Sequence, residues 1–295
     1  MTIAILGGTG RIGRHAVAAL EAAGADLRLL VRAGGAAPSR LPSVVVDLDA
    51  PSGLDAALAD CARLLLLTPH GPQQERREHA AVTAAARAGV AGIVKVSGCP
   101  ASLSPNGPTS TAVGHWRTER LVERLGLAFA HVRPTFLFQN LLETVAPVVA
   151  RTGTLVGPFA DEPIAMVDAR DVADCAAALL LAPELGDRAH AVTGPAAVTH
   201  RQIARALDAR LVRLPLPLVE RALRRRGGSA WEREHQLRMA RHFATGAEGS
   251  PSDAVARLTG RAPRAVEAFL AEHARAFARS PRRRRPAPAA QEPTP

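Results

Sequence analysis

Short apolar runs alternate with amphipathic segments along the first half of this 295-residue chain. Runs of this kind are typical of strands buried on both faces, and the segments between them repeat apolar residues at helical spacing. The pattern predicts an α/β fold, a doubly wound parallel sheet with helices on both faces. We expect strands at 2–6, 27–32, 44–49, 63–69, 92–98, 127–134, 163–168 and 189–194, and helices at 12–23, 54–61, 74–89, 115–126, 171–182 and 198–207.

The alternation loosens after residue 140. The segment 209–217 is predicted to be a strand that runs into a proline-broken turn, and 218–278 is mostly helical. We expect 1–197 to form the sheet domain, with substrate-lobe insertions after 140, and 198–278 to form a small, mainly helical C-terminal lobe over the strand ends. The tail 279–295 is rich in arginine and proline, and we expect it to be disordered and dispensable for folding.

The first expected strand leads directly into the glycine-rich stretch ILGGTGRIG, and a helical pattern follows it. Gly7 allows a sharp turn, Gly10 lets the backbone approach a pyrophosphate, and Gly13 lets the helix pack against the sheet. The helix N-terminus then faces the phosphates. This strand–glycine–helix context predicts a dinucleotide-binding Rossmann domain over 1–197. The expected contacts in this loop are those of Gly7, Thr9, Gly10, Arg11, Ile12 and Gly13.

The end of the second expected strand carries Arg32, where NAD-selective sites place an acidic residue for the ribose 2′-hydroxyl. A guanidinium suits a 2′-phosphate, and Arg11 is placed to help, so we expect NADP, with NADPH favoured over NADH. A solvated surface arginine is the alternative. The other expected contacts follow the third and fourth strands: Asp47 and Leu48 beside the adenine, and Thr68, Pro69 and His70 beside the nicotinamide, although a solvated loop histidine explains His70 equally well.

Charge and composition narrow the classes of partner. The net charge of +10 comes almost entirely from arginine, and aromatic residues make up 3% of the chain, with no tyrosine. So few stacking platforms make a nucleic-acid partner unexpected. No apolar run reaches the roughly 18 residues of a membrane span, and the start of the chain lacks a basic leader, so we expect a cytoplasmic protein. The three cysteines lack metal-like or redox spacing, so we expect reduced thiols and no metal.

Ten segments follow one another in a characteristic order: ILGGTGRIG, LLVR, VVVDLDAPSGLDAAL, LLLLTP, IVKVSG, HWRTE, VRPTFLFQNLL, VDARDVADCAAALL, VTGPAAVTHRQIARAL and DAVARLTGRAPRAVEAFLAEHARAF. Through them the chain resembles the NmrA-like family of atypical short-chain dehydrogenases/reductases over about residues 1–278. The resemblance implies an NADP-binding Rossmann domain with a small C-terminal lobe. It leaves the activity open, because the family contains quinone, ether and enone reductases as well as regulators that bind the nucleotide without turnover.

Ordinary short-chain reductases use a tyrosine acid, which this chain lacks. At the matching place stand His115 and Glu119, whose spacing puts both side chains on one helix face. We expect His115 to donate or relay a proton, with the Glu119 carboxylate orienting it; a helix-surface pair without catalytic duty is the alternative. Similar pairs occur in quinone reductases of the family that the chain resembles.

Further candidates lie at the ends of the fifth and sixth strands. Ser97 is placed to hydrogen-bond the nicotinamide or substrate, because strand carboxyl ends face the ligand crevice. Lys95 lies one step deeper on the same strand face and either lines the cleft or forms a buried salt bridge with an acidic partner. The expected wall of the substrate pocket comprises Cys99, as an inert thiol, with Arg133, Phe136, Phe138 and Asn140, although phenylalanines at this spacing are also typical of a core.

These observations predict an NADPH-dependent reductase of a small hydrophobic acceptor such as a quinone or an enone. One alternative is a redox-sensing regulator that binds NADP(H) and signals to a protein partner. A non-redox lyase, cyclase or isomerase on the same scaffold is the other alternative. We expect a monomer or a homodimer.

Overall fold

A parallel sheet forms the centre of the computed structural model, which describes residues 1–35 and 41–279. Apart from Arg279, the expected tail lies outside the described residues. The strand order is β3-β2-β1-β4-β5-β6-β8 with every neighbouring pair parallel, so the predicted doubly wound Rossmann sheet is confirmed. The strands are β1 (Thr2–Leu6), β2 (Asp26–Val31), β3 (Ser43–Val45), β4 (Cys61–Leu66), β5 (Gly92–Val96), β6 (Ala128–Pro134) and β8 (Arg188–Val192).

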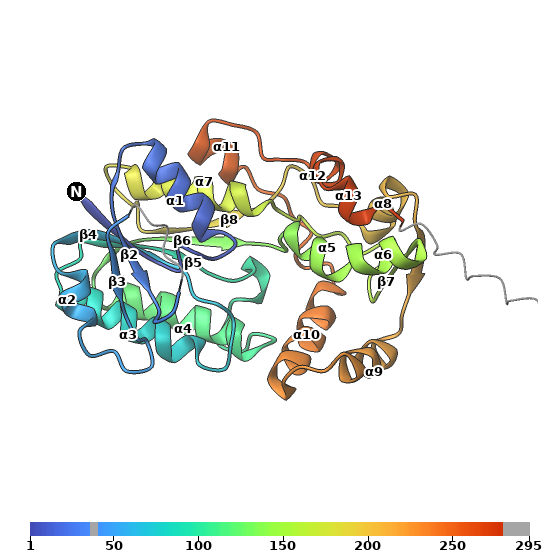
Figure 1. The fold of residues 1–295 in the computed structure, drawn as a ribbon, viewed down its shortest axis with the longest axis horizontal. Coiled ribbons are helices and arrows are strands. Elements are labelled where there is room, and N and C mark those ends of the chain that lie inside the picture. The colour runs from blue at the N-terminus through green and yellow to red at the C-terminus, as the bar shows by residue number, and fades with distance from the viewer. Residues whose placement is uncertain (36–40, 280–295) are drawn as a thin grey trace, which may run out of the picture.

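Helices cover both faces of this sheet (Figure 1). On one face, α1 (Gly13–Ala22) packs beside α7 (Ala169–Leu181), which also contacts α11 (Ala254–Thr259). On the other face lie α2 (Leu54–Leu58), α3 (Gln74–Arg87) and α4 (Ser110–Arg124).

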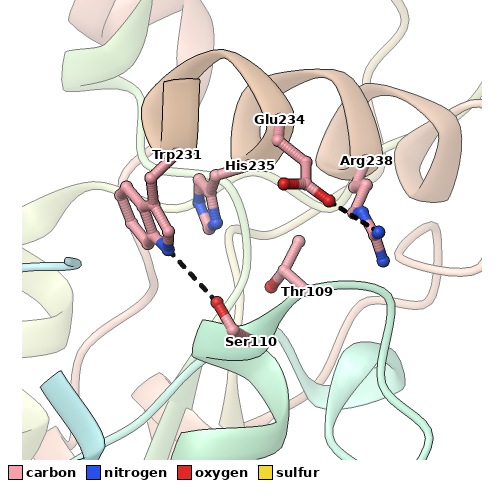
Figure 2. Close-up of a pocket in the computed structure, with 6 residues that line it drawn as sticks. All are labelled: Thr109, Ser110, Trp231, Glu234, His235 and Arg238. Atoms are coloured by element: carbon pink, nitrogen blue, oxygen red, sulfur yellow. Dashed lines mark hydrogen bonds and ion pairs between the residues drawn. The ribbon is translucent and has the colours of Figure 1, made fainter. Parts of the chain in front are cut away.

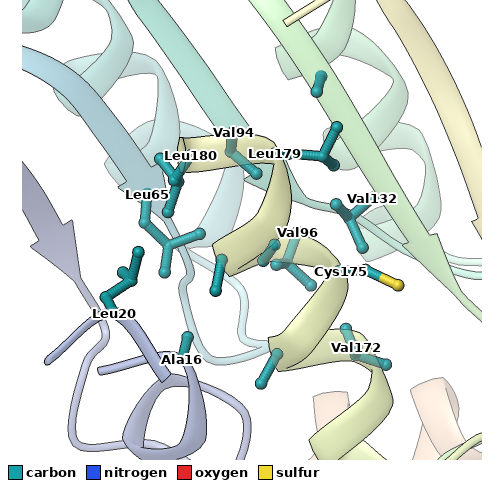
Figure 3. Packing of buried hydrophobic residues seen from close by; sticks show 14 of the residues in the cluster. Ala16, Leu20, Leu65, Val94, Val96, Val132, Val172, Cys175, Leu179 and Leu180 are labelled. Carbon is teal, nitrogen blue, oxygen red and sulfur yellow. The ribbon is translucent and has the colours of Figure 1, made fainter. Parts of the chain in front are cut away.

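Alternate residues of β1 belong to two different hydrophobic cores. Ile3 and Ile5 pack into the core beneath α1 and α7, whereas Ala4 and Leu6 pack into the core beneath α2 and α3. Successive strand residues point to opposite faces, so a strand buried on both sides must be apolar throughout. Figure 3 shows the first core, in which Leu65, Val94, Val96 and Val132 of the sheet meet residues of α1 and α7.

A second lobe lies beyond the carboxyl ends of the strands (Figure 1). Its own core extends from Phe138 to Phe277. The chain enters this lobe after β6 and returns to the sheet domain for α7 and β8. It then enters the lobe a second time and returns to the sheet domain for α11. The expected boundary between a sheet domain at 1–197 and a C-terminal lobe at 198–278 stays a prediction. The elements of the lobe are α5 (Gln139–Thr144), α6 (Ala146–Thr152), β7 (Thr154–Gly157), α8 (His200–Ala206), β9 (Arg210–Arg213), α9 (Leu216–Arg226), α10 (Ala230–Phe243), α12 (Val266–Glu272) and α13 (Ala274–Phe277), with β7 and β9 paired in parallel.

Three expectations about local structure need correction. The apolar segment 163–168 is not a strand; only isolated bridges, Leu137 to Val167 and Ile164 to Val198, involve it, and its apolar character reflects burial. The third strand ends at Val45, because the Asp47 carboxylate accepts the backbone N–H of Asp49 and turns the chain.

The helix expected at 115–126 begins earlier, at Ser110. Its N-cap is Thr109, whose side chain accepts the Ala112 N–H. None of the described helices has the length and apolarity needed to cross a membrane.

Candidate active site

The glycine loop between β1 and α1 lies where the strand order reverses, with β2 on one side of β1 and β4 on the other. Gly7 has a φ of +85°, and a Cβ there would lie 2.4 Å from the Leu67 carbonyl oxygen. At Gly13 a Cβ would lie 2.1 Å from the Gly7 carbonyl oxygen. Both positions therefore require glycine. A Cβ on Gly10 would meet only the Gly7 oxygen, at 3.2 Å, so its outer face is open to a ligand.

The N-terminus of α1 is suited to an anion. Ile12 occupies the N-cap position without a side-chain cap, and the first turn holds no acidic residue. The free N–H groups and the helix dipole at such an end attract phosphate. Since the loop is bare and the helix end is uncapped, these residues fit the pyrophosphate of a dinucleotide.

The two arginines expected near the cofactor differ in their surroundings. Arg32 is exposed just after β2 and makes no side-chain hydrogen bond or ion pair with the described residues. Arg11 is engaged: its Nη1 donates to Oδ1 of Asn140 at 2.5 Å, and its Nη2 pairs with Glu143 on α5. The contact between Arg11 and Asn140 thus links the glycine loop to the second lobe. Arg11 was expected to contact the cofactor, and Asn140 was expected in the wall of the substrate pocket.

A buried polar network lies at the carboxyl ends of β4 and β5. Lys95 Nζ lies 2.9 Å from Oε2 of Glu78, and both side chains are fully buried. The same Nζ lies 2.9 Å from Nδ1 of His115, and Oγ1 of Thr68 donates to Oε1 of Glu78 at 2.7 Å. Lys95 therefore has the acidic partner that the salt-bridge alternative requires. Thr68, expected beside the nicotinamide, holds Glu78 in place.

The protonation states of this network follow from its burial and its charges. Burial alone would raise the pKa of Glu78, but the adjacent Lys95 and His115 outweigh it and hold that pKa well below its usual range. Burial, and then the Lys95 ammonium, lower the pKa of His115. Near neutral pH the carboxylate is therefore charged and the imidazole neutral. Because Lys95 donates to Nδ1, the proton of His115 resides on Nε2.

Gln74 completes the surroundings of His115. Its amide nitrogen lies 2.8 Å from Nδ1 and 3.1 Å from Nε2 of the imidazole, and its Oε1 is buried without a hydrogen-bond partner among the described residues. His115 therefore has the nitrogen donors of both Gln74 and Lys95 beside it and is only 2% exposed.

The expectation that Glu119 orients His115 is wrong. Glu119 shares the helix face, but its carboxylate takes a bidentate interaction from Arg133, with Nε 3.0 Å from Oε1. Burial would raise the pKa of Glu119, and the hydrogen bond from Arg133 lowers it overall. The Ser97 hydroxyl is buried close to this pair and has no hydrogen-bond partner of good geometry among the described residues. The carboxylate that contacts His115 is Glu78, at 3.6 Å from Nδ1.

A row of aromatic rings connects His115 to the second lobe. The ring of His70 lies edge-on to His115, at 5.6 Å between centroids, and edge-on to His235 of α10, at 5.4 Å. His235 stacks on Trp231 at 5.0 Å. His70 is exposed to solvent on one side, and partial removal from bulk water, then the neighbouring His115, lowers its pKa. His70 is therefore a neutral, accessible imidazole beside the buried network.

The remaining expected pocket residues lie in different surroundings. Phe138 is 1% exposed and packs against Phe269, so the core interpretation holds for it. Phe136 meets Phe243 edge-on in the same core. Cys99 packs against that core too, and burial raises the pKa of its thiol. Leu48 packs into the core beneath α2 and α3, and Asp47 is exposed.

Sequence reasoning missed Gln74, Glu78, Trp231 and His235. A signal for the first two existed: they lie four residues apart, and α3 buries them on the same side as Ala81, Val82 and Ala85. Polar side chains inside an apolar stripe need buried partners. No such signal marked the two α10 residues. Across 1–35 and 41–279, no group of three or more His, Cys, Asp or Glu side chains is placed to bind a metal ion.

The fold and the glycine loop define a dinucleotide-binding protein. A family profile described as NAD(P)H-binding matches residues 7–183, and the chain belongs to this family. The NAD(P)H azoreductase of Xenophilus azovorans is 32% identical over 289 residues, which cover 93% of this chain and 99% of that protein. The (4-alkanoyl-5-oxo-2,5-dihydrofuran-3-yl)methyl phosphate reductase of Streptomyces griseus is also 32% identical, over 291 residues that cover 94% and 99%.

Solved structures share the fold. An NADPH-dependent quinone oxidoreductase from Escherichia coli, complexed with NADPH, superposes with a TM-score of 0.83 at 22% identity, covering 92% of this chain and 99% of its own. The triphenylmethane reductase of Citrobacter sp., complexed with NADP(H), gives a TM-score of 0.80 at 19% identity over the same shares. The family profile and the azoreductase of 32% identity confirm the resemblance drawn from the sequence, as well as the NAD(P)H cofactor. The protein is an NAD(P)H-dependent enzyme of a reductase family.

Proposed function

We propose that this protein is an NADPH-dependent reductase of a small hydrophobic carbonyl acceptor, a quinone or an enone. The single observation that carries the proposal is the contact of 2.9 Å between Lys95 Nζ and His115 Nδ1 at the strand ends. When bound, the dinucleotide supplies a hydride, which brings two electrons and one proton. Reduction of either acceptor to its dihydro product requires one further proton, which the chain must provide.

His115 is the proposed source of that proton. Nε2 carries the proton, and Lys95 passes a proton to Nδ1 along the existing contact as Nε2 releases its own toward the acceptor oxygen, so the imidazole stays neutral. The negative charge of Glu78 is then left uncompensated until Lys95 regains a proton. This arrangement supports His115 as the general acid in a chain that lacks the tyrosine of ordinary short-chain reductases. His70, whose ring lies edge-on to His115, is the solvent-accessible imidazole next to this network. It follows the fourth strand, where a contact with the nicotinamide was expected from the sequence.

Two further features support the acceptor class and the cofactor. The streptomycete relative is named for a substrate with a 5-oxo-2,5-dihydrofuran ring, a single ring that carries a carbonyl group. Arg32 is exposed at the end of β2, has no described partner to occupy its guanidinium, and suits a 2′-phosphate. The proposed cofactor is therefore NADPH in preference to NADH.

Stopped-flow mixing of NADPH-loaded protein with a panel of quinones and enones tests the proposal through loss of the reduced nicotinamide absorbance. We expect oxidation by at least one acceptor of each class. An enone is the sharper probe, because a high-potential quinone can accept the hydride without a proton donor in the slow step. Tight NADPH binding without oxidation by any member of the panel would contradict the proposal.

A further inference from the structure

A small pocket separates α10 from the N-terminus of α4 (Figure 2). Its volume is about 180 Å³, and its lining comes from both lobes. Trp231 and His235 point from α10 toward Ser110 and Thr109 of the sheet domain, and the indole N–H donates to Oγ of Ser110 at 3.2 Å. Glu234 and Arg238, which pair at 2.6 Å, close one side.

The position of this pocket relates it to the proposed chemistry. His235, one of its walls, lies edge-on to His70, and His70 lies edge-on to His115. The pocket is therefore two ring contacts away from the proposed proton source, and a proton from His115 would reach an acceptor bound there through the imidazole of His70. It also lies between the lobes, a position in which small-molecule sites commonly occur.

The wall combines flat rings with hydrogen-bond donors. Trp231 and His235 are stacked with an interplanar angle of 12°, which presents planar apolar surfaces. Ser110 accepts from the indole and Thr109 accepts from the helix backbone, so each hydroxyl keeps its proton for a ligand. Nδ1 of His235 is buried and has no partner among the described residues. Flat surfaces with donor groups match a planar ring that carries carbonyl oxygens.

We infer that this pocket binds the acceptor, and that the acceptor is a single planar ring bearing one or two carbonyl groups. The volume is below the roughly 300 Å³ at which sites for drug-sized ligands begin, so a one-ring molecule fits it. Trp231 provides the stacking surface, and Ser110 and Thr109 contact the carbonyl oxygens. This inference rests on the proposed function, since it names the acceptor of the same reductase.

Steady-state kinetics with duroquinone, a one-ring quinone without free ring positions for thiol addition, test the inference. Replacing the stacking surface in Trp231→Leu should raise KM about tenfold, while the Kd for NADPH and the melting temperature stay close to wild type. Trp231→Phe, which keeps a flat ring, should restore most of the lost affinity. Trp116→Phe is the matched control, because the other tryptophan lies on α4 outside this pocket.

A binding measurement separates this inference from the proposed function. In the Trp116→Phe protein, Trp231 is the only tryptophan, and duroquinone should quench its fluorescence to saturation, after correction against free tryptophan. Saturable quenching would support the pocket even if no acceptor oxidised NADPH. Linear quenching, or an unchanged KM in Trp231→Leu alongside normal turnover, would overturn the assignment and leave the reductase standing.

Discussion

Glu78 and Lys95 form an ion pair of 2.9 Å whose two side chains are completely shielded from solvent. Each of these two buried charges is stabilised by the other, because removal of one leaves the other buried without a compensating charge. His115 and Thr68 make further hydrogen bonds to the pair. The Glu78–Lys95 ion pair therefore contributes to the stability of the fold as well as to the chemistry of the candidate active site.

Glu78→Gln should lower the free energy of unfolding by about 3–5 kcal/mol, because it leaves Lys95 charged and buried. Urea unfolding measures this cost. The matched control is Asp55→Asn, which breaks the exposed pair with Arg87 and should cost less than about 1 kcal/mol. If both variants lowered the free energy of unfolding by the same small amount, the buried pair would not contribute the stability expected of it.

Glu78 and Glu119 should have different effects on the reaction. Glu78→Gln removes the carboxylate that lies beside Lys95 and His115, so we expect a slower enone reduction and a shifted pH profile of the rate. Glu119→Gln weakens the interaction with Arg133 and should mainly reduce stability. Single-turnover rates across pH, with both variants saturated with NADPH, distinguish them. A larger rate loss in Glu119→Gln would restore the role first expected for that residue.

His115→Ala should slow enone reduction by about 10²-fold or more if His115 supplies the proton. Ser97→Ala removes at most one hydrogen bond to cofactor or substrate, worth about 0.5–1.5 kcal/mol, and should slow the reaction by about 2- to 13-fold. Stopped-flow measurements on both variants provide the comparison. Unchanged turnover in His115→Ala would exclude this residue as the acid.

Arg32→Ala should raise the Kd for NADPH about tenfold or more and leave that for NADH unchanged, because only NADPH carries the 2′-phosphate. Fluorescence titration of both nucleotides measures the preference. Arg151→Ala, which removes an exposed arginine on α6, serves as the control for net charge. A preference that survives in Arg32→Ala would assign the selectivity to another residue.

Stability should fall as the pH drops from about 6.5 to about 4. Burial lowers the pKa of His131 and of His200 from 6.5 to about 4. Between these values the unfolded chain binds more protons than the folded protein, so acid favours unfolding, by up to about 3 kcal/mol for each group.

Urea unfolding at a series of pH values checks this dependence on buried histidines. His200→Phe should flatten the pH dependence, since Phe159 already packs against that ring at 5.0 Å. A pH slope equal to that of the wild type would assign the effect to other groups.

The sheet was predictable because burial on both faces leaves a continuous apolar run, as in β1 and in the second half of β4. The same rule failed at 163–168, where burial occurs without strand pairing. Burial determines the residue types, but hydrogen-bond partners depend on the tertiary arrangement. The helices at 139–152 and strand β7 escaped prediction because each is short.

The glycine loop was predictable because backbone geometry at Gly7 and Gly13 tolerates no side chain. Helical spacing correctly placed His115 and Glu119 on one face of α4. It could not show that β6 would bring Arg133 to Glu119, or that α3 would bring Glu78 to Lys95 and His115. Such partners are set by tertiary packing across separate elements.

The repeated passage of the chain between the lobes affects how the protein can be divided. The second core needs residues near Phe138 as well as those near Phe269, whereas α11 covers α7 on the sheet domain with Ala254 and Val255. A fragment ending at residue 197 would therefore expose part of α7 and separate Phe138 from Phe269. A single cut at this position therefore does not yield two self-contained pieces, and the two lobes must be expressed as one unit.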